Sequence, residues 1–131
     1  MSAILLIDDD PSLTHLLSIA LSKKGCSVDI AYTVESALEY AQKNDYDLIL
    51  QDVFYPNKED GLKVMERYYP FSSAKHTPIV LMTAMPMDLL SAQDNFEHYL
   101  SMAKLFISKS DDLSQIVDRV MEIISEQNPA A

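Results

Sequence analysis

Five residues with charged or hydroxyl side chains stand at the ends of short apolar runs in this sequence. Asp8 and Asp9 follow ILLI, Asp52 ends DLILQD, Thr83 ends PIVLMT and Lys109 follows LFIS. Carboxylates a few ångströms apart repel each other by about 1 kcal/mol per pair in water, and several-fold more near a protein surface. A hard divalent cation relieves this repulsion, and Mg²⁺ keeps water and phosphate oxygens among its ligands. The set therefore predicts a site for Mg²⁺ and phosphate.

Asp52 is the carboxylate that we expect to react, because it is central to the set. In the presence of the metal, one carboxylate can attack phosphorus and form an aspartyl phosphate. The cation, the ammonium group of Lys109 and the hydroxyl group of Thr83 would stabilise the charge on the phosphoryl oxygens. The predicted chemistry is phosphoryl transfer onto Asp52.

The apolar runs must be strands if they are to bring these residues together. Runs of strand length occur at 4–7, 26–31, 48–52, 78–83 and 104–108, and helical patterns begin near residues 11, 34, 62, 96 and 113. Asp10 and Thr33 are predicted helix N-caps, and Gly25 is predicted to end the first helix. Five alternations of strand and helix predict the α/β class, with a mostly parallel sheet covered on both faces. Ligands of such sheets bind at the carboxyl ends of the strands.

Length and composition restrict the kinds of protein this chain can be. Its 131 residues, 48% of them apolar, predict one domain over residues 1–126, followed by a disordered tail over 127–131. The net charge of -10 disfavours binding of this domain to nucleic acid, which requires clustered Lys and Arg. The apolar runs are too short to span a membrane, and the first residues do not form a secretory signal, so we expect a cytoplasmic protein. Cys26, the only cysteine, is predicted to be a small buried residue at a strand start.

The order of these motifs resembles the receiver domain of two-component response regulators. ILLIDDDPS, LILQDVFYP with a later DG, PIVLMTA and LFISK carry the resemblance, which extends from Ala3 to about Ser125. It implies a flavodoxin-like, doubly wound sheet of five parallel strands in the order 2-1-3-4-5. It also implies that a histidine kinase or a histidine phosphotransfer protein transfers a phosphoryl group to Asp52.

The resemblance assigns roles to further residues. Asp8, Asp9, Asp52 and the backbone carbonyl of Phe54 would bind Mg²⁺. Thr83 and Lys109 would contact the phosphoryl group and, with Asp52, form the catalytic set. Thr83 and Phe106 would move when the protein is phosphorylated and so change the affinity for an output protein, which the sequence does not identify. The chain would be a switch that catalyses its own phosphorylation and dephosphorylation, rather than a metabolic enzyme.

Among the features that depart from the family pattern, two concern the segment that leads to Lys109 and the residue after it. Ser110 follows Lys109 where the family usually has proline, so we expect a trans bond and a rearranged loop at this point. The segment between Thr83 and Lys109 is several residues longer than is common. These departures leave open a second function, that of an interaction module that works without phosphorylation.

An enzymatic alternative begins from the spacing of Asp8 and Asp10. This D-x-D pair is also the first motif of haloacid dehalogenase-like phosphatases, whose later motifs would be Thr83, Lys109 and Asp111 or Asp112. The phosphatase hypothesis leaves Asp9 and Asp52 without a role. A simpler hypothesis for Asp8 to Asp10 taken alone is a negatively charged helix cap.

Overall fold

The sheet and most of its helices are defined in a computed structural model of the chain, which describes residues 2–52, 65, 67–71, 77–84, 91–92 and 96–127. The elements in chain order are β1 (Ser2–Ile7), α1 (Pro11–Lys23), β2 (Cys26–Ala31), α2 (Val34–Lys43), β3 (Leu48–Asp52), the 3₁₀ helix η1 (Tyr69–Phe71), β4 (Ile79–Thr83), α5 (Phe96–Met102), β5 (Leu105–Ser108) and α6 (Leu113–Gln127).

Local sequence signals explain where the first two helices begin and end. The carboxylate of Asp10 accepts hydrogen bonds from the amides of Ser12 and Leu13, at 3.0 and 3.3 Å, and so caps α1. Thr33 caps α2 through a reciprocal pair of hydrogen bonds with Ser36. Gly25, with φ of 88°, lies just beyond α1 in a conformation that L-residues rarely adopt. All three predicted helix boundaries are confirmed.

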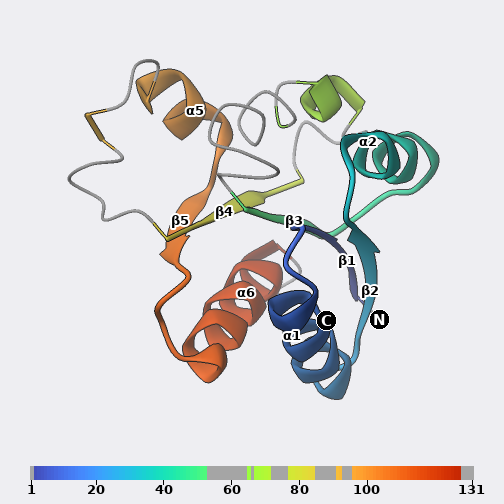
Figure 1. Cartoon of the computed structure of the whole chain (residues 1–131), viewed down its shortest axis with the longest axis vertical. Helices are drawn as coiled ribbons and strands as arrows, with labels where there is room; N and C mark the ends of the chain where they lie inside the picture. Colours follow the sequence, from blue (N-terminus) through green and yellow to red (C-terminus); the bar gives the residue numbers. More distant parts are fainter. Residues whose placement is uncertain are drawn as a thin grey trace.

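The five strands form one parallel sheet in the order β2-β1-β3-β4-β5. Every neighbouring pair is parallel, and the central register pairs Ile7 with Gln51 and Asp52 with Met82. Helices α1 and α6 cover one face, and α2 and α5 lie on the other (Figure 1). The predicted α/β class, strand order and coverage of both faces are therefore confirmed.

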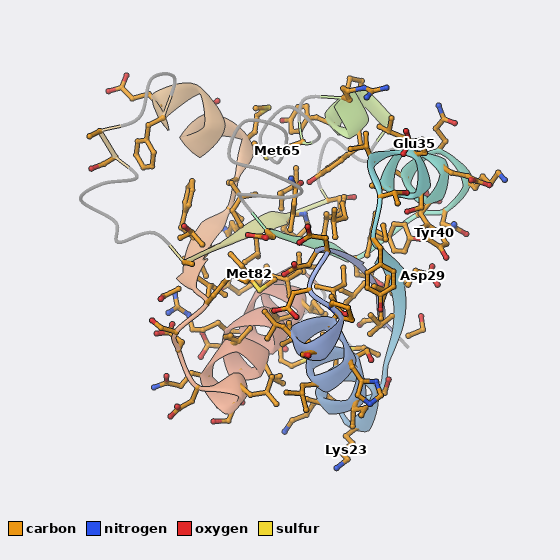
Figure 2. All side chains as sticks on the ribbon, viewed as in Figure 1. Lys23, Asp29, Glu35, Tyr40, Met65 and Met82 are labelled. Atoms are coloured by element: carbon orange, nitrogen blue, oxygen red, sulfur yellow. The ribbon has the colours of Figure 1, made fainter. Side chains whose placement is uncertain are left out.

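Two apolar cores hold the layers together, one on each face of the sheet. Leu50 and Met82 point toward α1 and α6, where they pack with Leu17 and Val120. The opposite core contains Met65 and is closed by residues of α2 and by Tyr68. In Figure 2, Met65 and Met82 lie on opposite sides of the strands. Burial on both faces explains why the central strands are almost wholly apolar.

Some predicted boundaries differ from the structure by one or a few residues. Helix α6 continues to Gln127, one residue into the predicted tail, and the remaining tail lies outside the described residues. Of the helix predicted to start near residue 62, the described residues Met65, Arg67 and Tyr68 are helical, and the chain then enters η1. Cys26 is buried at the start of β2, as predicted. Within the described parts of the chain, no helix combines the length and apolarity needed to cross a membrane.

Candidate functional site

Three carboxylates predicted to form a site lie together at the C-terminal edge of the sheet. Asp8 directly follows β1, and Asp52 is the last residue of the adjacent strand β3. One oxygen from each of Asp8, Asp9 and Asp52 lies within 4.8 Å of the others. Asp8 is fully buried and Asp52 is 6% exposed, whereas Asp9 is exposed to solvent. This group, called the carboxylate cluster below, joins two buried charges to one that solvent can reach.

Lys109 directly follows β5, which lies two strands away from β3, and it supplies a cation to the carboxylate cluster. Its Nζ lies 3.1 Å from Oδ2 of Asp8 and 3.3 Å from Oδ2 of Asp52. Strand β4 stands between β3 and β5, so the lysine side chain must pass the end of β4. The backbone amide of Lys109 donates to the carbonyl oxygen of Thr83 at 2.8 Å, which ties the lysine to the last residue of β4.

The charges in the cluster shift each other's protonation equilibria. The pKa of Asp8 is raised, chiefly because burial disfavours its charged form, and the negative charge of Asp52 adds to this shift. The amide of Asp10, which donates to Asp8, and the positive charge of Lys109 lower the pKa of Asp8 by less. Burial alone would lower the pKa of Lys109, but Asp8 and Asp52 outweigh this effect and raise it. Lys109 therefore remains a cation at neutral pH.

The residues of the cluster fit a hard divalent cation. Oδ2 of Asp8 is buried and forms an ion pair with Nζ of Lys109 at 3.1 Å, and among the described residues it accepts no further hydrogen bond. Lys109 supplies one positive charge to two buried carboxylates, so a divalent cation would compensate the negative charge that remains. All three side chains offer carboxylate oxygen, the ligand type that Mg²⁺ prefers.

Of the remaining predicted residues, two lie in β4 and β5, and one lies outside the described chain. Thr83 is buried at the end of β4, and its side chain belongs to the same edge of the sheet. Phe106, the predicted switch aromatic, lies in β5, and the centroid of its ring is 5.5 Å from the ring centroid of Phe96 in α5. Phe54, the predicted carbonyl ligand, lies outside the described residues.

Asp10 does not belong to the carboxylate cluster. Its side chain is exposed and caps α1, so the phosphatase hypothesis loses the second residue of its D-x-D pair.

A buried polar pair beside Asp52 was not predicted from the sequence. The hydroxyl group of Tyr68 donates to Oε1 of Gln51 at 2.5 Å, and both residues are fully buried. The signal available in the sequence was a glutamine inside an otherwise apolar strand, because a buried amide requires a hydrogen-bond partner. The pair joins the strand that carries Asp52 to the segment before η1.

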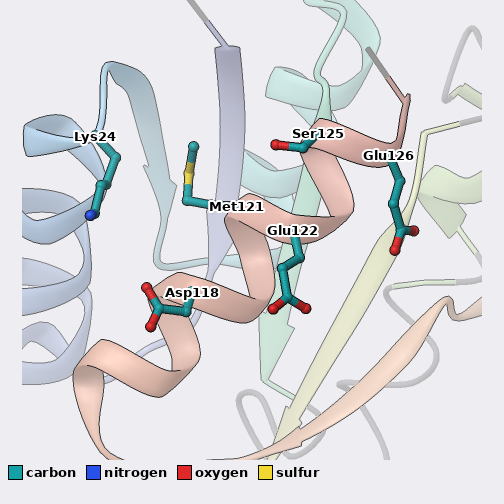
Figure 3. A pocket seen from close by; sticks show the side chains of 6 residues that line it. All are labelled: Lys24, Asp118, Met121, Glu122, Ser125 and Glu126. Carbon is teal, nitrogen blue, oxygen red and sulfur yellow. The ribbon is translucent and has the colours of Figure 1, made fainter. Parts of the chain in front are cut away.

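A separate pocket of about 560 Å³ opens between α1 and α6, away from the carboxylate cluster (Figure 3). Its lining consists of Lys24, Asp118, Met121, Glu122, Ser125 and Glu126. Its acidic residues are exposed on α6, and the residues of the carboxylate cluster and Lys109 do not line it. The candidate site is therefore the sheet edge rather than this pocket.

The fold and the carboxylate cluster define a doubly wound α/β domain with a candidate divalent-metal site at its strand ends. Residues 4–121 match the family model of the response regulator receiver domain. The chain belongs to this family of two-component signalling domains, as the motif resemblance predicted. This membership excludes the haloacid dehalogenase-like alternative.

Known relatives agree with this assignment. The response regulator ArlR of Staphylococcus haemolyticus is 28% identical over 97% of this chain and 54% of its own length. The transcriptional regulatory protein CpxR of Escherichia coli is 36% identical over 68% of this chain and 36% of its own length. The chain thus spans about half the length, or less, of these curated relatives.

Solved structures share the whole fold. A receiver domain protein described as CheY-like, from Methanospirillum hungatei, superposes with a TM-score of 0.81 at 21% identity and covers 100% of this chain and 99% of its own. The response regulator TrrA of Thermotoga maritima, solved with Mg²⁺ and BeF, has a TM-score of 0.74 at 27% identity and covers 94% of this chain and 99% of its own.

Proposed function

We propose that this domain accepts a phosphoryl group on Asp52 in a Mg²⁺-dependent reaction, with a histidine kinase or a histidine phosphotransfer protein as the donor. The observation that carries the proposal is the meeting of Asp8, Asp9 and Asp52 within 4.8 Å, with Lys109 against two of them. Further support comes from the TrrA structure, whose description names Mg²⁺ and BeF. The receiver domain is proposed to extend over residues 1–126.

The chain's own residues would divide the work of the transfer. An oxygen of Asp52 forms a bond to phosphorus as the phosphorus–nitrogen bond of the donor histidine breaks, and the imidazole keeps the electron pair and takes up a proton from water. The ammonium group of Lys109 and the hydroxyl group of Thr83 stabilise the negative charge on the phosphoryl oxygens. Asp8, Asp9, Asp52 and the carbonyl of Phe54 would hold Mg²⁺, which neutralises developing charge when it is bound.

The protein would act as a switch because the product differs from Asp52 in charge and size. A phosphoryl group adds negative charge and strong hydrogen-bond acceptors beside Thr83 and Lys109. Thr83 and Phe106 are proposed to respond and to change the affinity for an output protein. A cytoplasmic location, and no binding of this domain to nucleic acid, are parts of the same proposal.

Intact-mass spectrometry after incubation with acetyl phosphate and Mg²⁺ tests the proposal. We expect one phosphoryl adduct, which is absent without Mg²⁺ and absent in Asp52→Asn. Asp118→Asn is the matched control, because it makes the same chemical change at an exposed position on α6 and should keep the adduct. An adduct that persists in Asp52→Asn would refute Asp52 as the acceptor.

A second candidate function, that of an interaction module independent of phosphorylation, is prompted by Ser110 after Lys109 and by the long segment between Thr83 and Lys109. A solved structure with a TM-score of 0.79 and 27% identity, covering 98% of this chain and 53% of its own, is described as belonging to redox sensors in the streptococci that evolved from two-component response regulators. Under this alternative, wild-type protein would show no adduct at any Mg²⁺ concentration.

A further inference from the structure

The turn that carries Lys109 is hydrogen-bonded at every backbone amide from residue 109 to residue 112. The amide of Lys109 donates to the carbonyl of Thr83 at 2.8 Å, and the amide of Asp111 donates to the carbonyl of Ser108 at 3.1 Å. The amide of Asp112 donates to Oε1 of Gln115, at 3.1 Å, at the start of α6. The fourth amide, that of Ser110, donates to a side chain, Oγ of Ser108, at 3.2 Å.

Ser108 accepts two of these four hydrogen bonds, one through its carbonyl group and one through its hydroxyl group. Its hydroxyl group also lies 2.6 Å from that of Ser110, so the two side chains share a hydrogen bond across Lys109. Ser108 is paired with Thr83 in the sheet, and its position is therefore set by β4. Short side chains that bond to the backbone two residues on stabilise turns of this kind.

The geometry of this turn determines where the lysine side chain can reach. Nζ of Lys109 must cross the end of β4 to lie 3.1 Å from Asp8 and 3.3 Å from Asp52. A long, unbranched side chain has many conformations, so a fixed backbone origin lowers the entropy lost when the ammonium group is held in place. Displacement of a reacting group by about 1 Å can cost orders of magnitude in rate.

We propose that Ser108 is a positioning residue for Lys109: its hydroxyl group holds the turn in the geometry that directs the lysine ammonium group at Asp8 and Asp52. This role rests on the proposed phosphoryl transfer to Asp52. Ser108 is not among the residues proposed to bind the phosphoryl group or the metal, and it acts through Lys109. The hydrogen bond that it accepts requires an N–H group at residue 110, which serine provides and proline would lack.

The test is a double-mutant cycle on the rate of phosphorylation by acetyl phosphate with Mg²⁺. We expect Ser108→Ala to lower the rate constant about three- to tenfold, as the loss of one net hydrogen bond would. In the Lys109→Ala background the same substitution should change the rate constant less than about twofold, because a residue that acts through Lys109 has nothing left to position. A merely structural role would give the same loss in both backgrounds and would overturn the proposal.

Two further variants serve as controls for this cycle. Ser108→Thr keeps the hydroxyl group and should retain the wild-type rate constant, whereas a loss equal to that of Ser108→Ala would overturn the role of the hydroxyl group. Ser18→Ala removes a half-buried hydroxyl group that donates to the carbonyl of His15 in α1, far from Lys109 in the sequence, and it should leave the rate unchanged.

Failure of the proposed function is distinguishable from failure of this inference. If wild-type protein forms no adduct, the phosphoryl transfer is refuted, and the cycle is then measured as the urea midpoint of unfolding in EDTA. Positioning of Lys109 against the two carboxylates predicts that the effects of Ser108→Ala and Lys109→Ala on the midpoint are not additive. Additive effects would overturn the positioning role.

Discussion

Removal of the Lys109 ammonium group should destabilise the metal-free protein, and Mg²⁺ should reverse most of the loss. At an effective dielectric constant of about 20, charges 3.1 and 3.3 Å apart attract by about 5 kcal/mol each, which gives a gross attraction of about 10 kcal/mol. Desolvation of the buried ions consumes several kcal/mol of this attraction, and breaking a buried pair costs about 3–5 kcal/mol net. Because the Lys109 side chain is 18% exposed, we expect Lys109→Ala to lower the free energy of unfolding by the lower end of this range, about 3 kcal/mol.

Mg²⁺ should stabilise Lys109→Ala more than the wild type because the metal and Lys109 would share the same two carboxylate partners. Lys109 and a divalent cation would both neutralise Asp8 and Asp52, so the variant without the lysine has more uncompensated charge for the metal to relieve. Mg²⁺ should therefore raise the free energy of unfolding of Lys109→Ala more than that of the wild type.

The assay is urea unfolding of both proteins in EDTA and in Mg²⁺, followed by circular dichroism. With an m-value of about 2 kcal/mol per molar, the midpoint of Lys109→Ala in EDTA should fall by about 1.5 M. The matched control is Lys104→Ala, which removes an exposed lysine before the opposite end of β5 and should shift the free energy by less than about 0.5 kcal/mol. Equal midpoints for Lys109→Ala and wild type in EDTA would refute the electrostatic reasoning, as would an equal response of the two proteins to Mg²⁺.

Two predictions concern stability away from the site. Gly25→Ala should cost about 1 kcal/mol, measured as a lower urea midpoint, because φ of 88° strains an L-residue although an added Cβ would meet no atom within 4 Å; an unchanged midpoint would contradict this account. Burial raises the pKa of Tyr68 and of Tyr46, and for Tyr46 the hydrogen bond to Asp29 adds to the shift. The unfolded chain loses these protons first, near pH 10, so their contribution to stability is complete below about pH 10 and is lost as the pH rises further. As the pH rises above about 10, the urea midpoint of Tyr68→Phe should fall less steeply than that of the wild type. Equal slopes of midpoint against pH for the two proteins would argue against the raised pKa of Tyr68.

The elements of this fold could be predicted because their signals are local. Apolar runs of strand length, the caps at Asp10 and Thr33 and the stop at Gly25 each act over a few residues, and all appear as predicted. The strand order followed from alternation of strand and helix together with the family resemblance. Boundaries were less predictable: α6 continues to Gln127 because the end of a helix depends on packing and capping as well as on periodicity.

The position of the predicted site residues at one sheet edge also followed from the sequence, since the C-terminal ends of neighbouring parallel strands meet there. Asp8, Asp52, Thr83 and Lys109 each end or follow an apolar run, and the strand order β1-β3-β4-β5 brings these run ends side by side along one edge. Their roles in phosphoryl transfer remain predictions that the mass-spectrometric experiment tests.

Only the tertiary structure decided how these groups interact. The complete burial of Asp8, the exposure of Asp9 and the contact of one lysine with two carboxylates depend on strand register and on the packing of helices over the sheet. The bonds of Ser108 around Lys109 depend likewise on the path of one turn. Sequence patterns determined which residues reach the sheet edge because periodicity and capping are local, whereas distances and burial arise from contacts between residues far apart in the chain.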